Sequence, residues 1–481
     1  MVTGIKLPLP TMLSNLSTAT RVGTPRVSSN ATLPAAGSAS AKVTFGSQTQ
    51  AIAAIYSMSP QKISASASTQ ANSVIQDLMH TAMGGNSVSS FSNLGSALLE
   101  NLKENRGDLT QALTQTESGA ASDSKSAVSL DITTRSGSTV HLTLTQQDDG
   151  IAVSVKTEGN QLNDDEAEAV ASLGNAFQSV LNGLGAKPPK LDITELTKFN
   201  SNVLKSVDLK TDVRNGDNSL QSLNFHTDSS ESWVGYQDAD FSLKMTSDRG
   251  SSNDPADRIA QQIALAAYDK QFDQARIAGH GDRNQMELLK SVFHALNTPQ
   301  SEGIDVTGKS TEVRADGGNS GNSGNSGNST PSNGLNDFSL SLTQTSKLIN
   351  PARLDEKESF SYQASQTTEE SRSYDGSRSV KQTAHSHLSA SWYQQLDPSI
   401  PLSLNRDKTS QNYIYHTLEN DEVNTTTLNY NAKGLLASIN NQTQVNNLET
   451  MKKYVTGDLV DETNTPEKYN RETLKKLLND M

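Results

Sequence analysis

The chain has 481 residues, no cysteine and a formal net charge of −13 at pH 7. The lack of cysteine excludes disulfides, thiolate metal sites and cysteine nucleophiles. The negative charge disfavours nonspecific binding to nucleic acid and to anionic lipid. Only 33% of the residues are hydrophobic, so we expect part of the chain to lie outside any core. No apolar run approaches the roughly 18 residues of a membrane-spanning helix, so we expect no transmembrane segment.

The first part of the chain differs sharply in charge from the rest. Residues 1–76 contain no Asp or Glu, and the first carboxylate is Asp77. They hold 13 Ser and 9 Thr, and no basic cluster precedes an apolar stretch as in a Sec-type signal peptide. We predict that residues 1–72 form a disordered, Ser/Thr-rich arm. Its composition resembles the uncleaved N-terminal signals of bacterial proteins exported by type III or flagellar machines. The alternatives are a flexible tail that carries no export signal and an organellar transit peptide.

Periodicity in the next segments predicts helices and then strands. Apolar residues at helical spacing over 73–115 indicate that residues 73–126 are a helical segment. Over 127–157 apolar and polar residues alternate, with turn residues at Ser136-Gly137 and Asp149-Gly150, which predicts a three-stranded meander.

The meander opens an α+β module that we place at residues 127–300. Asn163 followed by Glu166 is typical of a capping box, and Pro255 predicts the first position of a helix that ends at Gly279. A further helix is expected near 283–296. Strands are expected near 206–213, 219–227 and 232–246.

A low-complexity stretch predicts a boundary between modules. Gly-Asn-Ser triplets repeat from Gly318, so residues 301–336 are expected to be a flexible linker. Residues 337–481 are predicted to form an antiparallel β-rich module, with a hairpin turning at Asp375-Gly376 and a C-terminal helix opened by Thr465-Pro466. The fold class expected is α+β, with helices and antiparallel sheets in at least two modules.

Two patterns suggest chemistry, and each has a simpler reading. Residues 303–310 match the P-loop pattern, but a loop precedes them and no helix follows, so we interpret them as a loop. His385 and His387 lie two apart on a predicted strand and share a face, where they could chelate a metal or lie in solvent. We predict no catalytic residues, no metal ligands and no cofactor.

Aromatic residues gather at two places in this aromatic-poor chain. Trp233 with Tyr236, and Trp392 with Tyr393, are our candidate binding residues, because aromatics anchor ligands and partners. Burial in a core is the alternative for each of them.

These observations favour a non-enzymatic bacterial protein, secreted or held at the cell surface by a non-Sec route, that acts through a protein or surface partner. No nucleic-acid partner is expected. A glycan- or peptide-binding module is the first alternative function, and a hydrolase with an unrecognised site is the second. A cytoplasmic location is the alternative for localisation.

Overall fold

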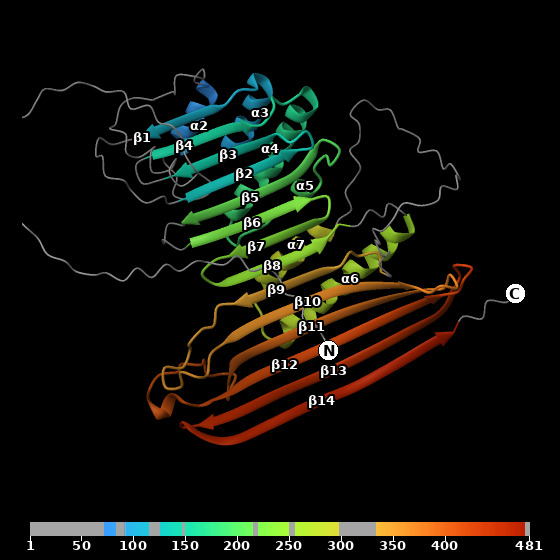
Figure 1. Cartoon of the computed structure of the whole chain (residues 1–481). Coiled ribbons are helices and arrows are strands. Elements are labelled where there is room, and N and C mark those ends of the chain that lie inside the picture. Colours follow the sequence, from blue (N-terminus) through green and yellow to red (C-terminus); the bar gives the residue numbers. More distant parts are fainter. Residues whose placement is uncertain are drawn as a thin grey trace, which may run out of the picture. The chain divides into compact units, whose positions relative to one another are not determined.

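The computed structural model describes most of the chain beyond residue 71. All described residues belong to the compact unit Phe45–Met481, and they form a mostly antiparallel β-structure with a few helices (Figure 1). They are residues 72–82, 91, 93–114, 126–146, 150–214, 220–249, 255–297 and 333–476. The predicted arm, the P-loop match at 303–310 and nearly all of the predicted linker lie outside these ranges.

Fourteen strands form one sheet in the order β1-β4-β3-β2-β5-β6-β7-β8-β9-β10-β11-β12-β13-β14. Each strand pairs antiparallel with its neighbours in that order. The strands are β1 (Leu109–Thr114), β2 (Ser126–Thr134), β3 (Thr139–Gln146), β4 (Gly150–Glu158), β5 (Leu204–Arg214), β6 (Leu220–Asp228), β7 (Glu231–Gln237), β8 (Phe241–Asp248), β9 (Phe338–Gln344), β10 (Ser359–Arg372), β11 (Arg378–Gln395), β12 (Tyr413–Tyr430), β13 (Leu436–Val455) and β14 (Asp458–Lys476).

The described helices pack against one face of this sheet. They are α2 (Ser73–Ala82), α3 (Leu94–Asn105), α4 (Asp164–Leu184), α5 (Thr194–Thr197), α6 (Pro255–Ala278) and α7 (Arg283–Asn297), with a short 3-10 turn η2 (Lys408–Ser410). Burial along β2 and along β5 to β8 alternates strictly or nearly so, because successive side chains point to opposite faces. We call the face under the helices the covered face and the opposite one the open face.

Several predicted elements are confirmed. The three-stranded meander corresponds to β2, β3 and β4, and α6 and α7 match the two helices expected before residue 300. At the start of α4, Asn163 Oδ1 accepts from the Glu166 amide at 2.9 Å, and Glu166 Oε2 accepts from the Asn163 amide at 3.0 Å. This reciprocal pair is the capping box.

The helical segment predicted over 73–126 is only partly correct. Helix α3 ends at Asn105; the next residue, Arg106, has a left-handed φ of 49°, and β1 then begins at Leu109. Leu109 and Leu113 lie four apart, which places them on one face of a helix but equally on one face of a strand. Both are buried, and β1 pairs with β4 from Leu109↔Val155 to Thr114↔Gly150. The spacing alone does not distinguish a helix from a strand here, and pairing with the edge of the sheet at β4 favours the strand.

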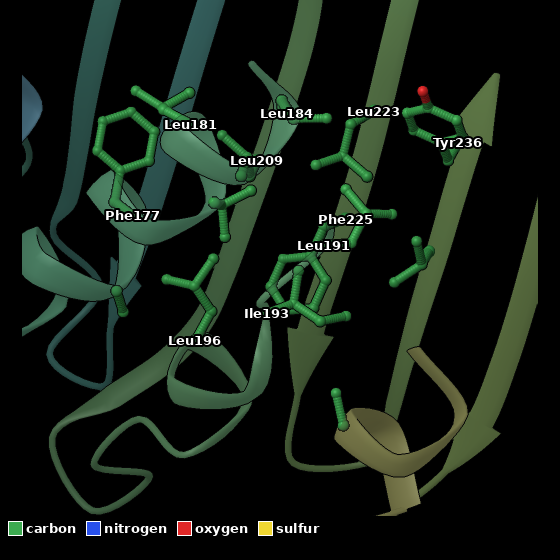
Figure 2. Packing of buried hydrophobic residues seen from close by; sticks show 14 of the residues in the cluster. Phe177, Leu181, Leu184, Leu191, Ile193, Leu196, Leu209, Leu223, Phe225 and Tyr236 are labelled. Carbon is green, nitrogen blue, oxygen red and sulfur yellow. The ribbon is translucent and has the colours of Figure 1, made fainter. Parts of the chain in front are cut away.

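The core fills the space between the covered face and the helices. Figure 2 shows Phe177 and Leu181 of α4 and Leu196 of α5 turned toward side chains from β5 and β6, among them Leu209 and Phe225. Helix α3 approaches α4 closely: a Cβ added at Gly95 would lie 2.2 Å from Phe177 Cε1. A glycine is thus needed where these helices meet.

Strands from both sides of the predicted linker belong to this one sheet. Strand β8 pairs with β9 from Phe241↔Gln344 to Ser247↔Phe338. On the covered face, Phe293 of α7 packs edge-on against Phe338 of β9, with ring centroids 5.0 Å apart. The pairing does not confirm the two-module layout.

The last part of the sheet has no described helix over it. The hairpin predicted at Asp375-Gly376 is confirmed, with Gly376 at φ 85° between β10 and β11. Beyond Leu418 of β12 and throughout β13 and β14, Tyr454 is the one buried side chain among the described residues. We call these segments, residues 419–430, 436–455 and 458–476, the bare strands.

The prediction of a C-terminal helix after Pro466 is wrong, because residues 458–476 form β14. Strand β14 pairs with β13 over its whole length, and Pro466 lies opposite Leu448. Proline is tolerated in a strand at a sheet edge, where its missing N–H faces solvent. Leu474 is part of the helical pattern, but it is 56% exposed, so burial of this residue would contribute little to forming a helix.

Candidate interaction surface on the open face

The open face is the more polar face of the sheet. No described helix covers it, and its side chains along β2 to β11 are mostly half-buried by their strand neighbours. Between β8 and β10 it is a strip of hydroxyls, in which Thr246 Oγ1 lies 2.8 Å from Ser339 Oγ and Thr343 Oγ1 lies 3.2 Å from Ser361 Oγ.

A single row of directly opposed residues crosses this face from β4 to β12. Each member is the registered partner of the next on the neighbouring strand. The row, which we call the cross-sheet row, consists of Lys156, His141, Asp131, Asp208, His226, Trp233, Thr246, Ser339, Ser365, His385 and Val423.

Two carboxylates face each other in the middle of four of these strands. Asp131 of β2 is registered with Asp208 of β5, which brings like charges together across the ladder. Each carboxylate has its own imidazole: His141 Nδ1 lies 2.6 Å from Asp131 Oδ1, and His226 Nδ1 lies 2.6 Å from Asp208 Oδ1. The arrangement His–Asp–Asp–His thus runs over β3, β2, β5 and β6.

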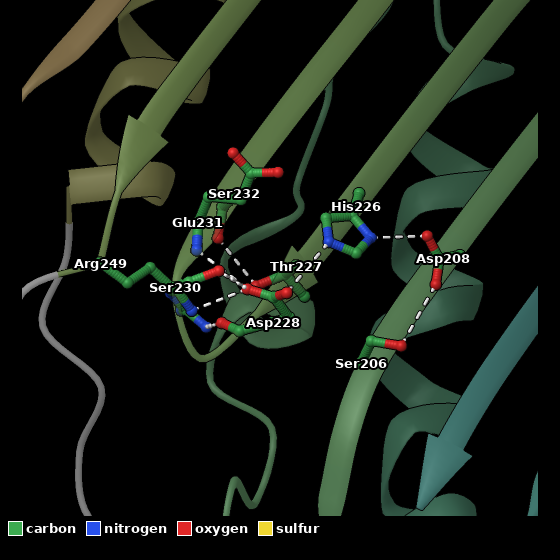
Figure 3. A network of polar contacts seen from close by, with 9 residues as sticks. All are labelled: Ser206, Asp208, His226, Thr227, Asp228, Ser230, Glu231, Ser232 and Arg249. Carbon is green, nitrogen blue, oxygen red and sulfur yellow. Dashed lines mark hydrogen bonds and ion pairs between the residues drawn. The ribbon is translucent and has the colours of Figure 1, made fainter.

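The imidazole of His226 is held from several sides (Figure 3). Its hydrogen bond with Asp208 raises the pKa of His226 against the opposing effect of burial, and the charges of Asp208, Asp228 and Glu231 add to the rise. Its Nε2 also lies 3.6 Å from Asp228 Oδ2. The protonated form is therefore stabilised on the open face.

The turn beside His226 is fixed by the same carboxylate. Asp228 Oδ1 accepts from the Ser230 amide at 2.7 Å, from the Ser230 hydroxyl at 2.8 Å and from the Glu231 amide at 2.9 Å (Figure 3). Burial alone would raise the pKa of Asp228, but these hydrogen bonds lower it. Arg249 donates to the Asp228 carbonyl at 3.1 Å and so ties β8 to this turn.

Trp233, one of the four candidate aromatics, lies on the open face and is accessible there. It is half-buried and stacks on His226, with ring centroids 5.7 Å apart and an interplanar angle of 25°. Tyr236 lies on the covered face at 1% exposure, and its hydroxyl donates to Asp238 Oδ2 at 2.8 Å. The two residues predicted as one group therefore point to opposite faces.

Trp392 and Tyr393 are likewise split between the faces. Trp392 lies between the imidazoles of His280 and His416, at centroid distances of 4.4 and 4.8 Å. Burial, and then the charge of His416, lowers the pKa of His280. Tyr393 lies on the same side of β11 as His385 and His387, which is the open-face side, and is buried there: it packs against Tyr413 at 5.1 Å and donates to the Glu356 carbonyl at 2.6 Å.

A second group of histidines and carboxylates lies where the covered strands meet the bare ones. His385 Nε2 lies 2.8 Å from Asp421 Oδ2, and His387 lies 3.5 Å from both Asp421 and Glu419. Ser389 donates to Glu419 at 2.6 Å. In the described ranges, no three His, Asp or Glu side chains are placed so that they could hold one metal ion.

Two neighbouring hollows lie beside this group on the open face. The larger, of about 530 Å³, is lined by Asp421, Val423, Gln444, Val445, Asn446, Lys468, Tyr469 and Asn470. The smaller, of about 300 Å³, is lined by His387, Glu419, Asn420, Asp421, Asn446, Asn447, Leu448, Pro466 and Lys468. They share Asp421, Asn446 and Lys468, so we treat them as one feature, the β12–β14 hollow.

Sequence reasoning missed both the cross-sheet row and the hollow. The row depends on the pairing of β2 with β5, strands separated by two other strands and two helices along the chain. His385 and His387 were the one signal near the hollow.

None of the described helices combines the length and apolar character that crossing a membrane requires. No protein-family model, curated protein or solved structure matches this chain.

Proposed function

We propose that the protein is a non-enzymatic, exported or surface-associated bacterial protein, and that the open face is where it contacts its partner. In this proposal residues 1–72 act as the export signal, and residues 301–336 are a flexible linker between two modules. Support for export comes from the acid-free composition of residues 1–76.

The observation that carries the contact surface is the cross-sheet row. Half-buried side chains that a structural sheet could fill with Ser or Thr are here two opposed carboxylates, each bonded to an imidazole. Trp233 stands beside them, and tryptophan is enriched where partners bind. Like charges directly opposite each other cost stability, which favours a role in recognition over one in folding.

Fractionation of the producing cells tests the export half. Intact protein in the medium or on the surface, with an unprocessed N-terminus, supports an uncleaved signal. Retention in the cytoplasm, or a reporter fused to residues 1–76 that stays inside the cell, would overturn it.

The contact half is tested with purified protein added to washed producer cells. Trp233→Ser should reduce the bound fraction several-fold, because an aromatic anchor typically contributes more than 1 kcal/mol. Tyr374→Ser is the matched control, since this aromatic is fully exposed in the β10–β11 turn and off the row. Equal binding by both variants would contradict a contact through the row.

A glycan- or peptide-binding module that uses Trp233 is the second candidate. The half-buried indole with a polar neighbour on each side favours it, because sugars and peptides are held by an aromatic platform flanked by hydrogen-bonding groups. Unchanged binding of Trp233→Ser on glycan and peptide arrays would argue against this candidate.

A further inference from the structure

The β12–β14 hollow gathers several amide side chains that are not bonded to one another. On the same face, Asn440 donates to Glu472 at 3.0 Å and Thr450 donates to Asn464 at 2.7 Å, whereas Gln442 makes no side-chain hydrogen bond with the described residues. Within the described part of the chain, the hollow's own amides Gln444, Asn446 and Asn470 make no side-chain hydrogen bond.

This lack of pairing is not forced by distance along the strands. Gln444 is registered with Asn470, and Asn446 with Lys468, so each side chain has a polar group directly opposite. On the other face of β12 and β13, a directly opposed pair does form a hydrogen bond: Thr443 donates to Asn424 at 2.6 Å. The donors and acceptors in the hollow are therefore open to a ligand or to solvent.

The charges in the hollow do not favour an ion. Asp421 stands on β12 and Lys468 on β14, with Asn446 registered between them. Asp421 is already bonded to His385 at 2.8 Å, and Glu419 accepts from Ser389 at 2.6 Å. A site with both signs of charge and amides in the middle offers no single-sign field to a phosphate, a cation or a nucleic acid.

We propose that the β12–β14 hollow binds an uncharged oligosaccharide. Each sugar hydroxyl donates and accepts at once, and amides and carboxylates provide the matching acceptors and donors. Leu448 and Pro466 in the smaller part and Val423 in the larger part offer apolar surface to the C–H faces of sugar rings.

The site rests on the proposed use of the open face, but it is separate from Trp233. Trp233 lies on β7, whereas the hollow lies on strands β11 to β14. Failure of sugar binding together with intact, Trp233-dependent cell binding would remove this site and leave the proposed function standing. The reverse result would keep the site and remove the contact through the row.

The test uses the full-length protein on an array of uncharged, amino-sugar and uronic-acid oligosaccharides, followed by calorimetry with the best uncharged probe. The double variant Asn446→Ala/Asn470→Ala should weaken binding on the order of tenfold or more, because two hydrogen bonds of about 1 kcal/mol each are lost. Asn441→Ala is the matched control, since this exposed amide lies on β13 but on the opposite face. It should change affinity less than twofold.

The outcome is read together with unfolding curves, which should be unchanged because all three amides are exposed. Binding by no uncharged oligosaccharide would overturn the proposal. So would an equal loss in the Asn441 control, or binding confined to uronic acids and abolished by Lys468→Gln, which would indicate an anion site on Lys468.

Discussion

Strands β1 to β11 and the bare strands belong to one sheet but are stabilised in different ways. In the first set, alternate side chains are buried under helices, as with Leu130, Leu209 and Phe225. In the second set both faces are wet, and the side chains that contact each other are mostly Asn, Gln, Thr and Glu. Burial of apolar area is worth about 25 cal/mol per Å², and the bare strands obtain little of it. Backbone pairing along strands of 18 to 20 residues continues there without a core.

A sheet can therefore extend beyond its core when its register is already set. Strand β12 begins in a core of tyrosines, with Tyr413 buried and packed against Tyr454 of β13 at 4.9 Å. The hydroxyl of Tyr413 also donates to buried Glu356 at 2.7 Å. This anchored end fixes the pairing, and the bare strands propagate it.

The largest expected effect compares an aromatic from each region. Phe177→Ala should lower the free energy of unfolding by about 3–5 kcal/mol, because it leaves a cavity between α3 and α4. Tyr469→Ala on β14 should change it by less than about 0.5 kcal/mol, because this ring is 48% exposed. Urea unfolding measures both values. A Tyr469 variant as damaged as the Phe177 variant would show that the bare strands have a core of their own.

A smaller effect is expected from crowding the helix layer. Gly95→Ala places a methyl group 2.2 Å from the Phe177 ring and should destabilise by about 1–3 kcal/mol through forced repacking. Gly235→Ala is the control, since nothing lies within 4 Å of a Cβ on this open-face glycine of β7. Thermal unfolding of the two variants gives the comparison. Equal melting temperatures would mean that α3 moves away from α4 without cost.

The open face of the covered strands should give a pH dependence through His226. Its pKa is raised in the folded state above the ordinary 6.5. The stabilisation is therefore fully present below pH 6.5 and is lost as pH rises through the higher folded pKa. We expect a contribution of at most about 1 kcal/mol, since His226 is partly exposed. His226→Gln should remove this slope in urea unfolding between pH 5 and 8; an unchanged slope would assign it to another group.

The smallest effect contrasts two carboxylates that each pair with a histidine. Asp131→Asn should stabilise by a few tenths to about 1 kcal/mol at low salt, because it removes one of two opposed charges and keeps an oxygen for His141. Asp421→Asn on the bare strands should not stabilise, since the residues opposite Asp421 are His387 and Asn446. Unfolding at low salt and at about 1 M salt separates the charge effect, which salt screens. Stabilisation by both changes would contradict the role of opposed charge.

Local sequence patterns predicted single helices and strands well, but they did not predict which strands lie side by side. The alternation from Val128 to Val155 was enough for β2, β3 and β4, and the Asn163 and Glu166 spacing was enough for the start of α4. Leu109 and Leu113 were misread because a four-residue spacing suits both periodicities. The residues after Pro466 were misread because that proline can begin a helix or stand in an edge strand, and pairing with β13 decides between them.

The candidate site was harder to predict for the same reason. Trp233 was identified by its rarity, but its neighbours His226 and Asp208 come from other strands and depend on register. Tyr236, three residues away, was grouped with it although an odd spacing in a strand points to the opposite face. The β12–β14 hollow draws on four strands whose amides carry no sequence signature.

Pro466 has a consequence for how this sheet meets other sheets. Strand β14 pairs with β13 alone among the described strands, so its outer side offers backbone groups along 19 residues to any extended chain. Such a rim templates fibrils in many proteins. Pro466 interrupts the rim near its centre with a position that cannot donate, and Lys468 and Arg471 follow within five residues. We therefore expect a concentrated sample to stay free of thioflavin-positive aggregates, and replacement of Pro466 by valine to promote them.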